Sequence, residues 1–122
     1  MRLVCAVVAL IAIAPVSAVT PDERLARMLA GRTAGTPMRC IRPDRGVQPE
    51  IIDGKAIVYR DARQTYVARF KGGCPALREG RITISRGAGG QLCTNDPVRI
   101  AEATGTDFGF CAIESFTPYA KR

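Results

Sequence analysis

The 122-residue sequence contains no histidine and no tryptophan. The absence of histidine excludes Ser-His-Asp and Cys-His hydrolases, ribonucleases with paired histidines and ordinary zinc hydrolases, because each needs an imidazole that titrates near neutral pH. Ser85 and Ser115 therefore lack the usual general base. The lysines that could replace it are Lys55, Lys71 and Lys121, and surface solubility explains these better than catalysis does.

Acidic residues are also few, 11 in the whole chain. Two carboxyl groups about 5 to 10 Å apart can hydrolyse glycosides. However, Asp53 and Asp107 lie in sequence contexts typical of turns, and Glu50, Glu102 and Glu114 are expected at strand edges, where charges keep sheets soluble. Nothing in the spacing of these residues brings two carboxyl groups together.

The chain has only one long apolar run, Leu3–Ala14, which follows the positive charge of Arg2 and ends at Pro15. This run is too short for the roughly 20 residues that a membrane-spanning helix needs, and it is typical of a secretory signal peptide. Small residues precede Val19, so we expect signal peptidase to remove residues 1–18. The mature protein would then be periplasmic or secreted, and the signal would be its one contact with a membrane.

Removal of this segment takes away one of the 18 basic residues and leaves a formal net charge of +6 instead of +7. Four cysteines remain, Cys40, Cys74, Cys93 and Cys111, whereas Cys5 is lost with the signal. An even number of cysteines in an oxidising compartment predicts two disulfides. No Cys-X-X-Cys pair is present, and the wide spacings do not suit a zinc site. We therefore expect neither a metal nor a cofactor.

The mature chain is predicted to begin with a short helix and a linker over residues 19–37. Thr20-Pro21-Asp22-Glu23 matches a capping box with proline at the first helical position, which predicts a helix over Pro21–Ala30. A linker is expected over Thr33–Pro37. The helix would pack on the domain through an apolar stripe formed by Leu25, Met28 and Leu29.

Residues 38–122 are predicted to form a single small β domain, because short β-branched runs alternate with turn residues. The fold class is mainly β, an antiparallel barrel or sandwich stapled by disulfides. The expected strands are Met38–Arg42, Glu50–Asp53, Ala56–Arg60, Thr65–Phe70, Arg81–Arg86, Val98–Glu102 and Phe108–Phe116.

Two local patterns are more specific. Asp53-Gly54 lies between two apolar pairs and supplies the positive φ of a tight hairpin turn. In the strand at Arg81–Arg86, alternation predicts that Ile82 and Ile84 are buried and that Thr83 and Ser85 face water.

Four cysteines allow three pairings, and the sequence alone does not choose among them. We expect Cys40 to pair with Cys111, because the first and last strands of a closed sheet are neighbours. Cys74 and Cys93 would then clamp the loop-rich segment around Ile82.

The cysteines and the aromatic-Pro-Tyr ending resemble a family of small exported proteobacterial proteins of unknown function. The resemblance would span about residues 38–119 and implies export and a cysteine-stapled domain, but no activity and no catalytic residues. It rests on Arg39-Cys40-Ile41, Ile57-Val58-Tyr59-Arg60, Gly73-Cys74-Pro75, Leu77, Gln91-Leu92-Cys93, Phe110-Cys111 and Phe116-Thr117-Pro118-Tyr119.

Most of the basic residues are arginines, whose planar guanidinium suits carboxylates and phosphates. A basic face of this kind would bind an anionic envelope component or an acidic protein, but not nucleic acid, because export separates the two. A solvated surface is the simpler interpretation. The candidate anion-binding residues are Arg39, Arg42, Arg45, Arg60 and Arg63.

The preferred hypothesis is therefore a non-catalytic binding or structural module of the cell envelope. One alternative is a small enzyme with a carboxylate or a tyrosine–arginine centre at residues such as Tyr59, Tyr66 and Arg60. Another alternative is a secreted inhibitor of a hydrolase. The sequence does not indicate an oligomeric state.

N-terminal sequencing of the exported protein is expected to begin at Val19, because the apolar run ends at Pro15 and small residues precede the cut. A mature chain that retained Met1, or that began at a lipidated Cys5, would contradict this interpretation.

Overall fold

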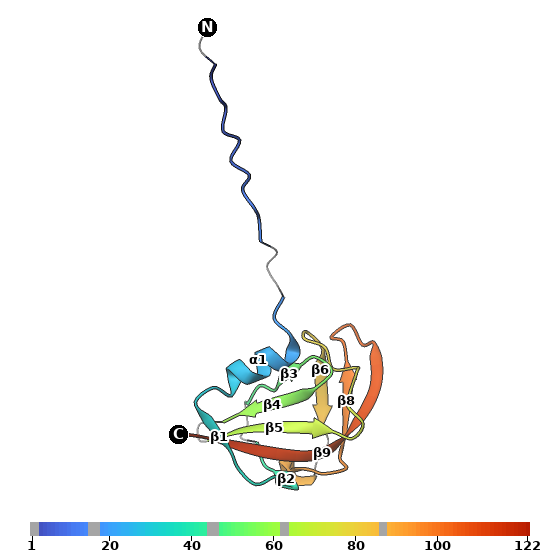
Figure 1. Ribbon diagram of the computed structural model, residues 1–122. Helices are drawn as coiled ribbons and strands as arrows, with labels where there is room; N and C mark the ends of the chain where they lie inside the picture. Colours follow the sequence, from blue (N-terminus) through green and yellow to red (C-terminus); the bar gives the residue numbers. More distant parts are fainter. Residues whose placement is uncertain (1–2, 15–17, 44–46, 62–63, 86–87) are drawn as a thin grey trace.

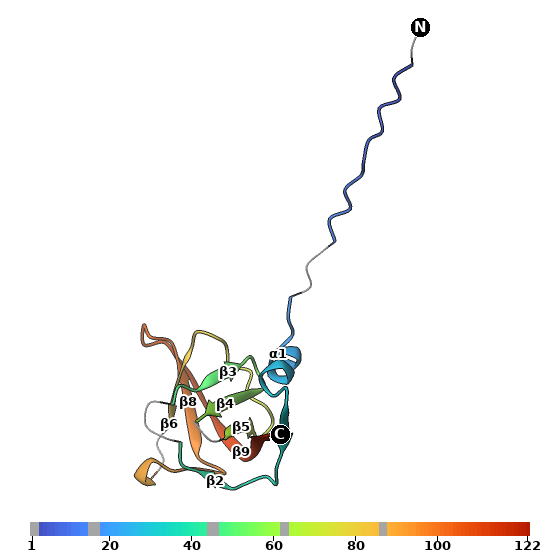
Figure 2. The same ribbon diagram turned by 90° about the vertical axis from the view of Figure 1, so that its left-hand side faces the viewer.

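The structure is a computed structural model, and it describes residues 3–14, 18–43, 47–61, 64–85 and 88–122. Residues 3–14 form neither helix nor strand and extend away from the folded domain (Figures 1 and 2). Their large apolar side chains are exposed, including Leu3, Leu10 and Ile13. Among the described residues, no helix has the length and apolar character needed to cross a membrane.

Helix α1 spans Pro21–Met28 and begins as the capping box predicts. The Glu23 N–H donates to the Thr20 hydroxyl at 3.2 Å, which satisfies one of the free amides at the helix start. Leu25 is buried under the helix, and Met28 and Leu29 pack beside it. The predicted apolar stripe is therefore confirmed, although the helix ends two residues earlier than expected.

A seven-stranded antiparallel sheet forms the body of the domain and curls into a half-barrel (Figures 1 and 2). Its longest strand, β9, pairs with β5 through its second half and with β8 through its first half. The strand order is β3 (Glu50–Ile52), β4 (Ala56–Arg60), β5 (Thr65–Phe70), β9 (Asp107–Lys121), β8 (Pro97–Ala101) and β6 (Ile82–Ser85), with β1 (Arg32–Ala34) paired to the end of β9.

A second, two-stranded sheet joins β2 (Cys40–Ile41) to β7 (Leu92–Cys93), after the short 3-10 turn Ala88–Gly90. All seven predicted strands are present, β4 and β5 with the predicted ends and the other five with shifted ends, and the mainly β fold is confirmed. The alternation of apolar and polar residues did not reveal two of the strands. These are β1, which lies in the segment expected to be a linker, and β7, which is too short to show a period of two.

The predicted hairpin at Asp53-Gly54 is confirmed. It joins β3 to β4 with Ile52 opposite Ala56, and Gly54 has a φ of +67°. This left-handed conformation favours glycine, because a side chain there would be strained.

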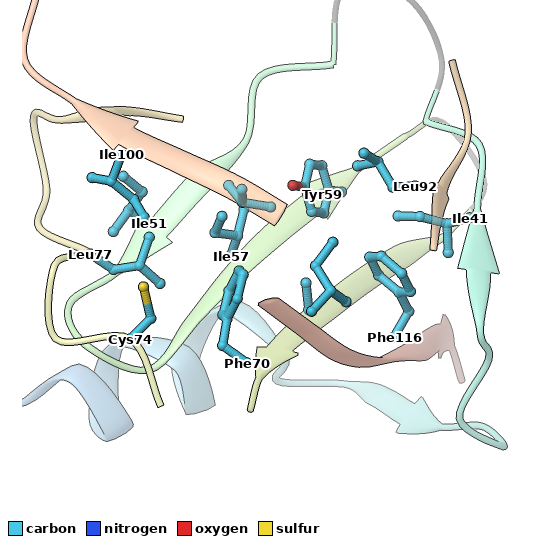
Figure 3. Close-up of a cluster of buried hydrophobic side chains, with 13 residues drawn as sticks. Ile41, Ile51, Ile57, Tyr59, Phe70, Cys74, Leu77, Leu92, Ile100 and Phe116 are labelled. Carbon is cyan, nitrogen blue, oxygen red and sulfur yellow. The ribbon is translucent and has the colours of Figure 1, made fainter. Parts of the chain in front are cut away.

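Two apolar clusters stabilise the sheet, one on each surface. The outer cluster packs under α1 and contains Leu25, Ile52, Ala56, Val58 and Val67. The inner cluster fills the half-barrel, and its two ends are covered by segments outside the large sheet. Figure 3 shows Leu77 and Cys74 at one end, and Ile41 and Leu92, from β2 and β7, at the other.

All four predicted disulfide cysteines are bonded, but the expected pairing is wrong. The bonds are Cys40–Cys93 and Cys74–Cys111. Cys40 and Cys93 lie directly opposite each other in the two-stranded sheet, and that sheet depends on β7, which the sequence did not reveal. Cys74 follows β5, and β5 pairs with the strand that carries Cys111. Each disulfide therefore fastens one of the two segments that cover the ends of the inner cluster.

Strand β9 carries a bulge that reverses which side chains face inward. Arg99 pairs with Phe110, whereas Ala101 pairs with Asp107, so the register shifts between these two pairs. Gly109 lies in the bulge with a φ of +84°. As a result Phe108 packs against the inner cluster, while Phe110, two residues later, faces outward.

The predicted facing of β6 is wrong. Ile82 and Ile84 are 45% and 41% exposed, and Thr83 and Ser85 take the inward positions. Thr83 pairs with Ile100, and Ser85 pairs with Val98 of the inner cluster. Side chains of paired residues share a face of the sheet, so the register imposed by β8 turns the isoleucines outward.

Peptide mapping without reduction is expected to yield linked peptides Cys40–Cys93 and Cys74–Cys111. Each bond closes a loop in the unfolded chain and so stabilises the fold by about 4 kcal/mol. The total stability of a domain is only about 5 to 15 kcal/mol. Replacing Cys74 and Cys111 together by alanine should destabilise the domain more than replacing Cys40 and Cys93, because Cys74 is fully buried and its loss also leaves a cavity. Equal midpoints of urea unfolding for the two double variants would contradict this ranking.

Candidate functional site

The outward side of β6, β8 and β9 carries a patch of exposed apolar side chains. Ile84, Arg99 and Phe110 lie side by side across the three strands, and Phe110 is 67% exposed. With Pro97, these residues line a hollow of about 410 Å³ that is mostly apolar. We call the residues Ile82, Ile84, Pro97, Arg99 and Phe110 the outer apolar face.

Asp107 fixes the position of the arginine in this face. Arg99 Nη1 lies 3.2 Å from Asp107 Oδ2, and the other oxygen of Asp107 accepts the Gly109 N–H at 2.7 Å. One carboxylate therefore joins the bulge to the arginine. On the inner side of the sheet, the Arg81 guanidinium lies 3.5 Å from the centroid of the Phe108 ring, a cation–π contact.

The inward side of β6 borders a second, smaller hollow of about 260 Å³. Hydroxyl groups enter it from β4 and β6, and proline and leucine side chains form its walls. We call it the hydroxyl hollow. It is lined by Pro43, Pro49, Tyr59, Thr83, Ser85, Gly90 and Leu92.

Tyr59 is 5% exposed. Burial raises the pKa of its phenol to about 12, and the neighbouring Ser85 hydroxyl lowers that pKa in part. Within the described residues, the phenolic oxygen has no hydrogen-bond partner of normal geometry. The phenol is therefore neutral at physiological pH and cannot act as a general base.

The residues suggested for a tyrosine–arginine centre do not converge. Tyr59 faces the inner cluster, and Arg60, the next residue in β4, is exposed on the opposite surface, as alternation along a strand requires. Arg60 forms an ion pair with Glu50 at 3.6 Å. Tyr66 lies opposite Tyr59 in β5, so the two tyrosines share the inner surface and Arg60 does not join them.

The structure describes three of the five candidate anion-binding arginines, Arg39, Arg42 and Arg60. Arg39 and Arg42 flank β2 and are exposed, and the described residues give neither an ion-pair partner. Arg60 is paired to Glu50, as above. Arg45 and Arg63 lie outside the described residues. Whether these arginines bind an anion stays a prediction.

Within the part of the chain that the structure describes, no group of three or more histidine, cysteine, aspartate or glutamate side chains is close enough to hold a metal ion. Comparisons with protein-family models, with curated proteins and with solved structures found no match. The resemblance of the cysteine pattern to a family of exported proteins therefore stays a prediction.

The outer apolar face was not found from the sequence. Alternation in β6 identified the isoleucines but could not say which side of the sheet they occupy, because a period of two is the same for both sides. Gly109 was the available signal, since a glycine inside an apolar strand indicates a bulge.

Replacing Tyr59 by phenylalanine is expected to leave the fold intact and to stabilise it by up to about 1 kcal/mol at neutral pH, because a buried hydroxyl without a full partner is removed. The variant should also lose an alkaline transition. Since the folded pKa of Tyr59 lies above the unfolded value of 10.0, the stability of the wild type is independent of this group below pH 10. It falls as the pH rises from about 10 to 12, because the phenol ionises more readily in the unfolded chain.

The loss amounts to about 2 to 3 kcal/mol for a shift of this size. Urea unfolding between pH 8 and 12 measures it, and Tyr119→Phe is the matched control, because Tyr119 is a tyrosine of the same sheet that is only partly buried. Parallel stability curves for wild type and Tyr59→Phe would contradict the assignment.

Proposed function

We propose that the chain is an exported, non-catalytic binding module that docks an acidic protein partner on the outer apolar face. In this proposal residues 1–18 are a signal peptide, and the mature protein acts in the periplasm or outside the cell. The two disulfides support a compartment outside the cytoplasm, because such bonds persist where thiols are oxidised.

The proposal rests mainly on which side chains of β6 face solvent. A strand that turns two isoleucines to solvent and two hydroxyl residues inward loses stability, and conflicts of this kind between pattern and fold are expected at functional sites. Ile82 and Ile84 lie on β6 and Phe110 lies on β9, with Arg99 of β8 between Ile84 and Phe110. Ile84 and Phe110 line the same hollow, and clustered exposed apolar residues mark interaction sites more often than scattered ones do.

The chemistry of the face suits a protein partner. Aromatic and arginine side chains dominate the binding energy at protein interfaces, and Phe110 and Arg99 lie next to each other here. The hollow between Phe110, Ile84 and Pro97 can receive an apolar side chain from the partner. The bulge and the Asp107 contacts fix the direction of Phe110, which lowers the entropy lost on binding.

The positive net charge of the protein favours an acidic partner over a second copy of the chain. The mature chain carries a formal net charge of +6 when residues 1–18 are removed. Like charges keep two copies apart and speed the approach of an acidic protein. The exposed Arg39 and Arg42 add to this long-range attraction, which makes the basic surface a contributor to the rate of binding.

Phe110→Ser is expected to weaken binding at least about ten-fold, because truncating an aromatic side chain at the centre of an interface costs about 2 kcal/mol or more. The exported protein is immobilised with both disulfides formed. Acidic proteins retained from an envelope extract are identified by mass spectrometry, and the purified partner is titrated against wild type and variant. Binding should also weaken as salt is raised.

Met38→Ser is the matched control. Met38 is an exposed apolar residue (42%), but it pairs with Phe116 in the half of β9 that contacts β5. Equal binding by wild type and Phe110→Ser, or an equal loss in both variants, would overturn the proposal. Dimerisation lost in Phe110→Ser would assign the face to a second copy, and adsorption to anionic vesicles lost in the same variant would assign it to lipid.

A further inference from the structure

The hydroxyl hollow lies on the other side of β6 from the outer apolar face and takes no part in the proposed docking. It sits where the curled sheet remains open. β3 and β6 are the two ends of the strand order, and no pairing joins them within the described residues. Pro49, which precedes β3, and Ser85 of β6 both line the hollow, so it occupies the seam of the half-barrel. The open ends of β-barrels are common ligand sites.

Tyr59 indicates that the hollow receives a polar ligand. Its side chain reaches the hollow from β4 beside Leu92 (Figure 3), and its buried phenolic oxygen has no well-formed hydrogen bond to any described residue. Buried polar atoms in folded proteins almost always have a partner, and an exception needs an explanation. A ligand hydroxyl that binds Ser85 and turns the Ser85 hydroxyl toward the neighbouring phenol would supply the missing bond.

The lining defines the chemistry of this ligand. No described lining residue carries a charge, so the described lining offers a charged ligand nothing that would offset its lost hydration. Tyr59, Thr83 and Ser85 each both donate and accept hydrogen bonds, which matches a ligand whose groups also do both. The Pro43, Pro49 and Leu92 walls instead suit an apolar C–H surface.

The size of the hollow limits the ligand to one small ring. Its volume of about 260 Å³ lies just below the range of roughly 300 to 1,000 Å³ for sites of drug-sized ligands. A hydroxylated ring with one apolar face and no charge satisfies all three conditions. We infer that the hydroxyl hollow binds a single neutral sugar unit, with Thr83 and Ser85 as its contacts and Tyr59 as the residue that positions Ser85.

The test is a titration of the ¹⁵N-labelled exported protein, with both disulfides formed, followed by NMR. The probes are glucose, galactose and N-acetylglucosamine, with glucuronic acid and glucosamine as charged counterparts. At least one neutral sugar should give saturable shifts at Thr83, Ser85 and Gly90. The charged counterparts should bind about ten-fold more weakly, since nothing in the described lining offsets their desolvation.

Ser85→Ala and Tyr59→Phe should each weaken the neutral sugar by about ten-fold, the effect of losing one hydrogen bond in a buried site. Thr65→Val is the matched control, because Thr65 also carries a fully buried hydroxyl without a partner but does not line the hollow. Phe110→Ser should leave sugar binding unchanged, which separates this inference from the proposed docking.

Three results would overturn the inference. The first is the absence of saturable shifts with every neutral sugar. The second is binding of the anionic or cationic counterpart as tight as that of the neutral sugar. The third is neutral-sugar binding that Ser85→Ala and Tyr59→Phe leave intact, which would place the ligand elsewhere on the protein.

Discussion

The pairing of β9 along both of its edges is the constraint on which the rest of the domain depends. Its first half hydrogen-bonds to β8 and its second half to β5, so one strand joins the two halves of the half-barrel. β1 adds to its end, Cys111 anchors the segment that covers one end of the inner cluster, and Asn95 donates its N–H to Ile113 at 2.8 Å. Every segment that encloses the inner cluster is therefore held directly or indirectly by this strand.

The same strand explains why the molecule has two different sites on one sheet. The bulge at Gly109 places Phe108 on the inner surface and Phe110 on the outer surface. Because β8 pairs with both β9 and β6, its register with β9 also decides which side chains of β6 face outward. The isoleucines of β6 then join Phe110 on one surface, and its hydroxyl residues join Tyr59 on the other. A register one residue different would bury the isoleucines and expose the hydroxyls, because the side-chain period of a strand is two. Neither candidate site would then exist.

Sequence reasoning was reliable where short-range chemistry decides the structure. The capping box at Thr20 and the Asp53-Gly54 turn each depend on residues within three positions of one another, and both were predicted. The facing of β6 and the cysteine pairing depend instead on partners far along the chain. Cys40 meets Cys93 across a two-residue strand that has no pattern to detect, and the facing of Ile84 follows from Arg99 and Phe110. No local signal contains that information.

The position of β9 in the chain has a consequence for the order of events during synthesis. All other strands are made before it, yet the sheet cannot join its halves until residues 107–121 are available. Contacts so distant in sequence form slowly, since the entropy of loop closure must be overcome first. Most of this polypeptide therefore leaves the ribosome before it can acquire its native topology.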